Sequence, residues 1–143
     1  MPKIGQNGAN EMAWNSYPGS ALKVNALWYP TTPKDPTSYA TQREMRRMGF
    51  YPSSKFLLDG QFGPSSIAEL QKYLAKYGKS AGKYTGRIDG VMGNMTLSAM
   101  SSFIGLDGGN PWGIVTNKST VGPTHWPDYN LTRDWQKFLN KRR

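Results

Sequence analysis

The sequence predicts a mainly α-helical fold, a small helical bundle built from two overlapping helix-loop-helix repeats. An Asp-Gly-x-x-Gly motif occurs twice in the 143 residues, at 59–63 and again at 89–93. Apolar residues at helical spacing follow each copy, and a helical pattern containing a glutamine precedes each copy. A repeat of this kind indicates that one supersecondary unit is used more than once, with the middle helix shared between the two copies.

The helices around the two motifs share a spacing. Gln42 and Gln71 are each followed by a basic residue and, seven positions later, by a glycine. The Asp-Gly pair then comes 17 residues after Gln42 and 18 residues after Gln71. We therefore expect a repeat core over residues 38–105, in the order helix, glycine, loop, Asp-Gly turn and helix.

The residue types inside each motif fit a turn that leads into a helix. Aspartate can accept a hydrogen bond from its own downstream backbone, and glycine adopts positive φ without strain. Pro64 suits the first position of a helix, where its missing N–H costs nothing. Ser66 and Thr96 lie where a hydroxyl could bond the free N–H groups of the first helical turn. This structural interpretation accounts for most of the motif.

The flanks have a different character. Residues 1–37 are rich in glycine and proline without sustained periodicity, and we expect an irregular N-terminal arm. Residues 106–130 combine aromatic residues with proline and glycine, which predicts an ordered loop. A C-terminal helix is expected over residues 131–141, where residues 135–139 closely resemble residues 70–74.

The second unit resembles a known family. Residues 84–93, followed by Thr96 and an apolar helix, are similar to the core motif of peptidoglycan-binding domains, small three-helix modules found at the ends of bacterial and phage cell-wall hydrolases. The first unit departs from this pattern, since Ser66 replaces the threonine and no aromatic-x-Gly stretch precedes its Asp-Gly pair. The resemblance covers residues 38–105 and implies a peptidoglycan-binding-like domain over residues 38–143, with a noncatalytic wall-binding function.

The resemblance also implies a site around the Asp-Gly loops and the helix starts that follow them. Its candidate residues for binding a glycan or a stem peptide are, from the second unit and then the first, Tyr84, Arg87, Asp89, Thr96, Phe62, Ser66 and Tyr73. Five of them have a structural alternative that stays open. Phe62 and Tyr73 could belong to the core, Ser66 and Thr96 could cap helices, and Asp89 could serve only the turn.

The chain carries a net charge of +9. Its basic residues either keep helix faces soluble or attract a polyanion, such as an anionic wall polymer, a phage capsid surface or nucleic acid. The sequence shows no helix-turn-helix, zinc-finger or RNA-binding signature, so nucleic acid ranks low among these partners.

Catalysis is not expected, and neither is a metal or a cofactor. The chain has one histidine, His125, and no cysteine, which excludes a zinc site with several histidine or cysteine ligands. Glycoside hydrolysis needs only two carboxylates, and a pair among the nine acidic residues stays open. However, turn formation explains Asp59, and helix surfaces explain Glu44 and Glu69.

The location and partners follow from similar observations. The resemblance implies a wall-directed protein, yet the sequence has no apolar run of membrane-spanning length and no secretory signal at the N-terminus. A phage-encoded protein, on a virion or at a cell-wall surface, would reconcile these observations, and we expect this location. A piece of a longer exported protein would also explain these features. The alternative function is a structural virion protein, a capsid decoration or tail component, with residues 1–37 docking on capsid or tail proteins.

Overall fold

The computed structural model describes residues 22–78, 83–108, 120–121, 124–125, 127 and 129–142. This part of the chain is mainly helical and holds four helices and two short strands. These elements are α1 (Pro36–Arg47), α2 (Pro64–Tyr77), α3 (Asn94–Gly108), β1 (Thr120–Val121), β2 (Thr124–His125) and α4 (Tyr129–Lys141). The prediction of a small, mainly helical domain is confirmed.

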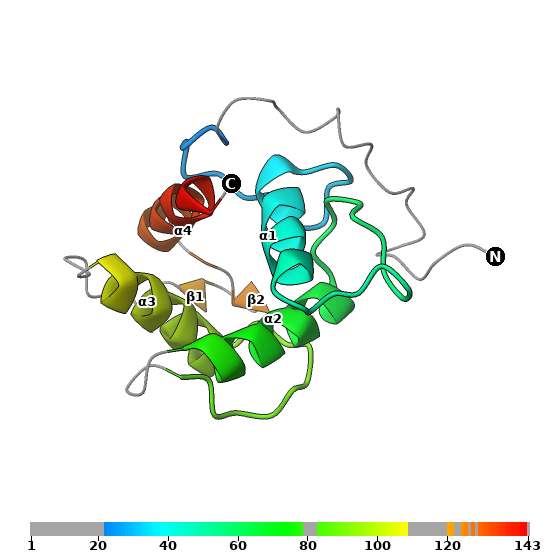
Figure 1. Ribbon diagram of the computed structural model, residues 1–143. Coiled ribbons are helices and arrows are strands. Elements are labelled where there is room, and N and C mark those ends of the chain that lie inside the picture. Colours follow the sequence, from blue (N-terminus) through cyan, green and yellow to red (C-terminus); the bar gives the residue numbers. More distant parts are fainter. Residues whose placement is uncertain are drawn as a thin grey trace.

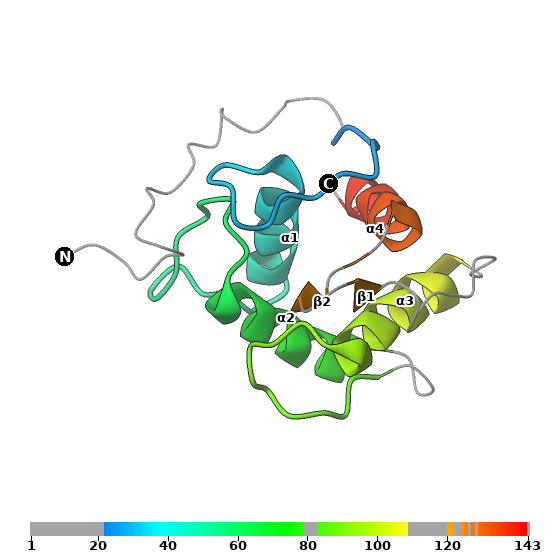
Figure 2. The ribbon, with the colours of Figure 1, turned by 180° about the vertical axis from the view of Figure 1, so that it is seen from behind.

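The four helices form a closed ring of contacts. Helix α1 packs against α2 and α4, and α3 also packs against α2 and α4, so each helix has two helical neighbours (Figure 1). The view from behind shows the same order (Figure 2). Aromatic side chains fill the space between the helices, with the ring of Phe103 lying 5.5 Å from that of Tyr73 and 5.1 Å from that of Phe138.

The helix starts reflect local chemistry. Asp35 accepts a hydrogen bond from the Ser38 N–H at 3.0 Å and caps α1, so the helix begins at Pro36, before the predicted residue 38. Helix α2 begins at Pro64, as expected for a proline at the first helical position. Gly78 follows the last residue of α2.

The apolar stripes predicted for the last three helices face the core. Their members are less than a tenth exposed, except for Tyr77, which is half-buried: Ile67, Leu70 and Leu74 in α2, Leu97, Met100 and Ile104 in α3, and Leu131, Trp135, Phe138 and Leu139 in α4. Helical periodicity therefore identified these core residues correctly.

The described residues of the segment expected to be one loop, residues 106–130, include the end of one helix, two short strands and the start of another helix. Helix α3 continues to Gly108, α4 already begins at Tyr129, and β1 pairs with β2 in antiparallel register. The strands are two residues long, too short for an alternating pattern to show in the sequence. Most of the aromatic residues of this predicted loop lie outside the described residues.

The described part of the predicted N-terminal arm packs on the helices. Residues 22–35 contain no helix or strand and run beside α4 and α1 (blue to cyan in Figures 1 and 2). The Leu22 N–H donates to Asn140 Oδ1 at 2.7 Å, and Asn140 Nδ2 donates to the Leu22 carbonyl at 2.9 Å. Leu22 and Trp28 are buried in the same core as the helices. Residues 1–21 lie outside the description.

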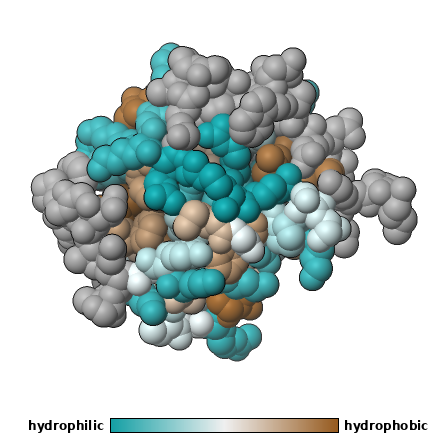
Figure 3. Space-filling model, in the orientation of Figure 1, coloured by the Kyte–Doolittle hydropathy of each residue, from teal (hydrophilic) through white to brown (hydrophobic). Residues whose placement is uncertain are grey.

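The face of the molecule seen in Figure 3 is mixed in character. Hydrophilic side chains cover its middle, where Figure 1 draws α1, and hydrophobic side chains appear below this area and to its left. Within the part of the chain that the structure describes, no helix has the length and apolar character needed to cross a membrane.

Candidate functional site

The two Asp-Gly motifs form two turns of the same geometry, in loop 1 (residues 49–63) and loop 2 (residues 83–93). In each turn, the aspartate Oδ1 accepts a hydrogen bond from the N–H two residues later, at 2.9 Å for Asp59 and 3.0 Å for Asp89. The glycine after the aspartate has φ of +71° in loop 1 and +72° in loop 2. The predicted turn chemistry is therefore confirmed for both copies.

The glutamine of α1 holds loop 1 with its whole amide group. Gln42 Nε2 donates to Asp59 Oδ1 at 3.2 Å, to the Gln61 carbonyl at 2.9 Å and to Ser66 Oγ at 3.0 Å. Gln42 Oε1 accepts a hydrogen bond from the Gly60 N–H at 3.0 Å. We call this arrangement a glutamine clamp: one side-chain amide that joins a turn to the hydroxyl at the start of the next helix.

A second glutamine clamp holds loop 2. Gln71 Nε2 lies 3.0 Å from Asp89 Oδ1, from the Val91 carbonyl and from Thr96 Oγ1. Gln71 Oε1 accepts hydrogen bonds from the Asp89 and Gly90 N–H groups at 3.0 and 3.1 Å. The residues that define the sequence repeat therefore come together in space in each copy.

A third glutamine clamp joins the two ends of the described chain. Gln136 Nε2 donates to Asn25 Oδ1 at 3.1 Å, to the Leu27 carbonyl at 3.0 Å and to Thr37 Oγ1 at 2.9 Å. Gln136 Oε1 accepts from the N–H groups of Asn25 and Ala26 at 3.1 and 2.9 Å. Ala26 has φ of +62°, the conformation that glycine supplies in the other two clamps.

The sequence pattern missed this third copy because its turn lacks the Asp-Gly signature. Asn25-Ala26 stands in place of Asp-Gly, and Thr37 follows Asn25 by twelve residues, whereas Ser66 follows Asp59 by seven. The signal that could have found it is a hydroxyl residue five positions before a clamp glutamine, as in the pair Thr37 and Gln42.

Loop 1 and loop 2 differ in what lies over them. Asp59 is fully buried, because the segment before α1 lies over loop 1. In this segment the Lys34 N–H donates to the Asp59 carbonyl at 2.9 Å, and the Asp35 N–H donates to the Gly60 carbonyl at 3.0 Å. Asp89 is exposed, and Val91 is 60% exposed. The Gln71 amide, with the Val91 N–H, lowers the pKa of Asp89 below its usual value.

The structure separates the seven predicted site residues into two groups. The buried group fills internal roles and comprises Phe62, Ser66, Tyr73, Tyr84 and Thr96. Ser66 and Thr96 bond clamp glutamines, and α2 has no side-chain cap at its first turn. The Tyr84 hydroxyl donates to the Arg87 carbonyl, and burial raises the Tyr84 pKa. Arg87 and Asp89 are exposed. A ligand-binding role for these residues stays a prediction.

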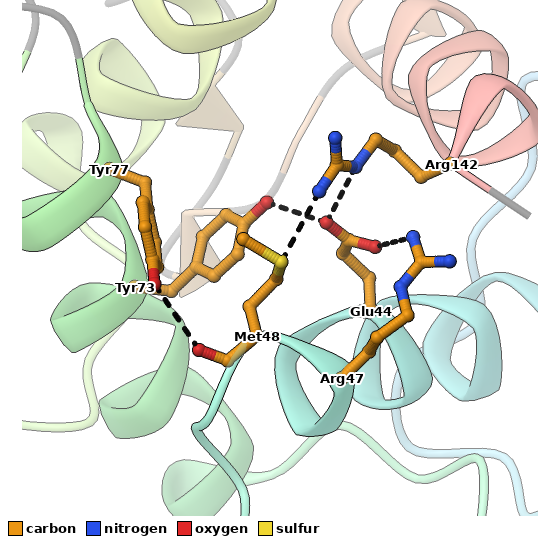
Figure 4. A network of polar contacts seen from close by, with 6 residues as sticks. All are labelled: Glu44, Arg47, Met48, Tyr73, Tyr77 and Arg142. Atoms are coloured by element: carbon orange, nitrogen blue, oxygen red, sulfur yellow. Dashed lines mark hydrogen bonds and ion pairs between the residues drawn. The ribbon is translucent and has the colours of Figure 1, made fainter.

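Tyr73 belongs to a polar cluster centred on the buried Glu44 (Figure 4). Glu44 is 4% exposed and accepts hydrogen bonds from the Tyr73 hydroxyl and from Arg142 Nε, both at 2.9 Å, as well as from Arg47. Burial and the negative charge of Glu44 raise the pKa of Tyr73. This cluster ties α1 and α2 to the residue that follows α4, which gives both Glu44 and Tyr73 a structural role.

Every acidic side chain that the structure describes has a structural partner. Asp35 caps α1, Asp59 and Asp89 belong to clamps, and Glu44 holds the cluster of Figure 4. Glu69 accepts from the Tyr51 N–H at 3.1 Å and pairs with Lys72, while Asp134 pairs with Arg133. Within the described residues, no three histidine, cysteine or acidic side chains gather in a way that could hold a metal ion. The His125 side chain lies outside the description.

The sequence resemblance to peptidoglycan-binding domains rests on residues 84–96 and on the repeat around them. Geometry brings the repeated residues together in clamps, and it leaves loop 2 as the more exposed of the two Asp-Gly loops. Comparison of the chain with protein-family models, with curated proteins and with solved structures finds no match.

Proposed function

We propose that this chain is a noncatalytic binding protein for bacterial cell-wall peptidoglycan, encoded by a phage. The observation that carries the proposal is the pair of glutamine clamps around Asp59 and Asp89. The residues behind the family resemblance come together in space in each copy of the repeat. This supports a domain of the peptidoglycan-binding type.

The partners of the acidic side chains support the noncatalytic part of the proposal. A glycosidase needs two carboxyl groups that are free to donate a proton and to attack or activate water. Glu44 and Asp59 are buried and engaged in hydrogen bonds with the protein, and Asp89 is held by Gln71. These hydrogen bonds give the three carboxylates a structural role, so no catalytic role is needed to explain their positions.

The positive charge suits a wall-directed protein. Exposed basic side chains occur on three of the four described helices, in α1 (Arg47), α2 (Lys72 and Lys76) and α4 (Lys137 and Lys141). Such charges raise the encounter rate with an anionic surface, and this attraction weakens as salt screens it. We therefore assign the first, electrostatic attraction to the wall to these basic side chains, and specific binding of peptidoglycan to loop 2.

A co-sedimentation experiment tests the proposal. The full chain is mixed with purified peptidoglycan sacculi, with and without their anionic polymers, at low and at moderate salt. Retention on stripped sacculi at moderate salt, without loss of turbidity, is the expected result. Retention that disappears when charge is screened would overturn specific wall binding and favour the virion alternative, which a protein census of purified particles would then check.

A matched pair of variants locates the site. Arg87→Gln removes an exposed cation of loop 2, and Lys55→Gln removes an exposed cation of loop 1. We expect Arg87→Gln to weaken sacculus binding by about fivefold or more, a change typical of a lost charge-assisted hydrogen bond. The Lys55 variant serves as the control and should bind like the parent chain. Equal binding by both variants would remove Arg87 from the site.

A further inference from the structure

Loop 1 shows how a polypeptide segment can occupy an Asp-Gly loop. The Phe62 N–H donates to the Pro30 carbonyl at 2.6 Å, and the Lys34 N–H donates to the Asp59 carbonyl at 2.9 Å. Gln61 Nε2 adds a hydrogen bond to the Thr31 carbonyl at 2.8 Å. The chain's own residues 30–35 therefore cover this loop, mainly through main-chain groups.

The length of the preceding turn explains why only loop 1 is covered. The clamp hydroxyl Thr37 follows Asn25 by twelve residues, whereas Ser66 follows Asp59 by seven, so the chain before α1 is five residues longer than the chain before α2. The extra length supplies the segment over loop 1. The shorter chain before α2 places Pro64 against Gly90, and proline has no N–H to bond the Gly90 carbonyl as Asp35 bonds the Gly60 carbonyl.

Loop 2 therefore has main-chain groups without hydrogen-bond partners in the described chain, whereas the equivalent groups of loop 1 are bonded to residues 30–35. Among the described residues, the Met92 N–H has no hydrogen-bond partner, whereas the equivalent Phe62 N–H is bonded to Pro30. The carbonyls of Asp89 and Gly90 likewise lack the partners that Lys34 and Asp35 give to loop 1 within the described chain. Gly90 and Met92 are buried residues, whereas Asp89 is exposed. Unpaired main-chain groups at such an edge can bond another peptide.

The side chains around this edge are apolar and cationic. The exposed large apolar residues of the described chain fall into two stretches, residues 24–29 and residues 88–95. In the second stretch, Ile88, Val91 and Met95 are 43%, 60% and 54% exposed, and Arg87 is exposed beside them. Figure 3 shows hydrophobic side chains near the lower edge of the molecule, where Figure 1 draws the segment between α2 and α3.

Loop 2 offers no aromatic face to a sugar ring. Its one aromatic residue, Tyr84, is buried, and the hydroxyl bonds the Arg87 carbonyl. Aliphatic side chains with a nearby guanidinium instead match a peptide that carries methyl groups and a free carboxylate. Within peptidoglycan, the stem peptide has this chemistry and the glycan strand does not.

We propose that loop 2 recognises the stem peptide of peptidoglycan through main-chain hydrogen bonds, as residues 30–35 occupy loop 1. A peptide carbonyl accepts from the Met92 N–H, in the role of the Pro30 carbonyl. Its alanine methyl groups contact Val91 and Met95, and its carboxylate pairs with Arg87. This inference rests on the proposed wall-binding function and names the part of the wall polymer that is bound.

An NMR titration of the full chain tests the inference. The probes are a synthetic stem pentapeptide, L-alanyl-γ-D-glutamyl-L-lysyl-D-alanyl-D-alanine, and chitotetraose as the glycan. We expect the pentapeptide to shift the amide resonances of residues 87–95 and chitotetraose to leave them in place. Shifts with chitotetraose alone, or pentapeptide shifts confined to other residues, would overturn the inference.

Matched variants separate this inference from the proposed function. Val91→Asp places a charge where the alanine methyl groups are expected to pack and should weaken pentapeptide binding at least tenfold. Val24→Asp makes the same change at an exposed valine of the other apolar stretch and should not weaken it. If Val91→Asp binds both the pentapeptide and sacculi like the parent chain, the loop 2 assignment fails and wall binding stands. If the parent chain binds neither sacculi nor pentapeptide, both proposals fail.

Discussion

Loop 1 and loop 2 are built around the same glutamine clamp, yet one is enclosed and the other is open. Gln61 of loop 1 is 5% exposed, whereas Val91 at the same place in loop 2 is 60% exposed. The clamp explains what the loops share, and the segment over loop 1 explains how they differ. A repeated motif can thus keep one internal geometry while the covering segment decides which copy has a surface left for a partner.

The largest expected effect comes from removing the clamp glutamines. Gln42→Leu leaves buried partners without hydrogen bonds in an enclosed loop, and each such group costs about 1–3 kcal/mol, so we expect a loss of about 3–5 kcal/mol in the free energy of unfolding. Gln71→Leu should cost about 1–2 kcal/mol, because two of its partners in loop 2, Asp89 and Val91, are exposed and water can reach them. Chemical denaturation measures both, and equal losses would contradict the contrast between the loops.

A smaller effect is expected from the glycine under the covering segment. In Gly60→Ala, the new Cβ would lie 2.6 Å from the Lys34 Cα, and the residue would keep a φ of +71°. Gly49 has φ of +97° and no atom within 4 Å of its new Cβ, so Gly49→Ala isolates the conformational cost of about 1–2 kcal/mol. We expect Gly60→Ala to destabilise the protein by about 1 kcal/mol more than this control, since backbone must move.

If the two alanine variants unfold at the same denaturant concentration, the segment over loop 1 is not held as closely as these contacts require. Hydrogen exchange at the Phe62 amide would then show the same loosening, because that N–H bonds the covering segment.

The smallest expected effect is a difference in acid titration. Burial raises the pKa of Asp35 in the covering segment, whereas the Gln71 hydrogen bond lowers the pKa of Asp89 in the open loop. The Asp89 contribution to stability is present above its unfolded pKa and is lost as the pH falls through its lower folded value. The Asp35 contribution has the opposite sign, being present at low pH and lost as the pH rises through its raised folded value. Carboxyl NMR measures both, and a higher pKa for Asp89 than for Asp35 would contradict the contrast.

Much of the fold was predictable because its signals are local. Apolar spacing identified the buried faces of α2, α3 and α4, Pro64 marked the start of α2, and the Asp-Gly pairs specified their turns. Each of these signals depends on residues within a few positions of one another in the sequence, so each can be recognised without knowledge of the tertiary structure.

The candidate site was harder to predict because it depends on distant residues. Spacing showed that Gln42 and Gln71 are equivalent, but only the folded chain shows that their amides bond Ser66 and Thr96. The resemblance therefore selected five buried side chains beside the exposed Arg87 and Asp89, and it left out the exposed Val91. A sequence motif marks which residues are constrained, and it does not distinguish internal contacts from external ones.

The sequence by itself determined the helices, the turns and the repeat, since these follow from periodicity and from the conformations open to aspartate, glycine and proline. Tertiary structure decided that Gln136 closes a third clamp on Asn25, because that contact joins residues 111 positions apart. It also decided that residues 30–35 cover loop 1 and leave loop 2 open, since exposure depends on which segments meet in space.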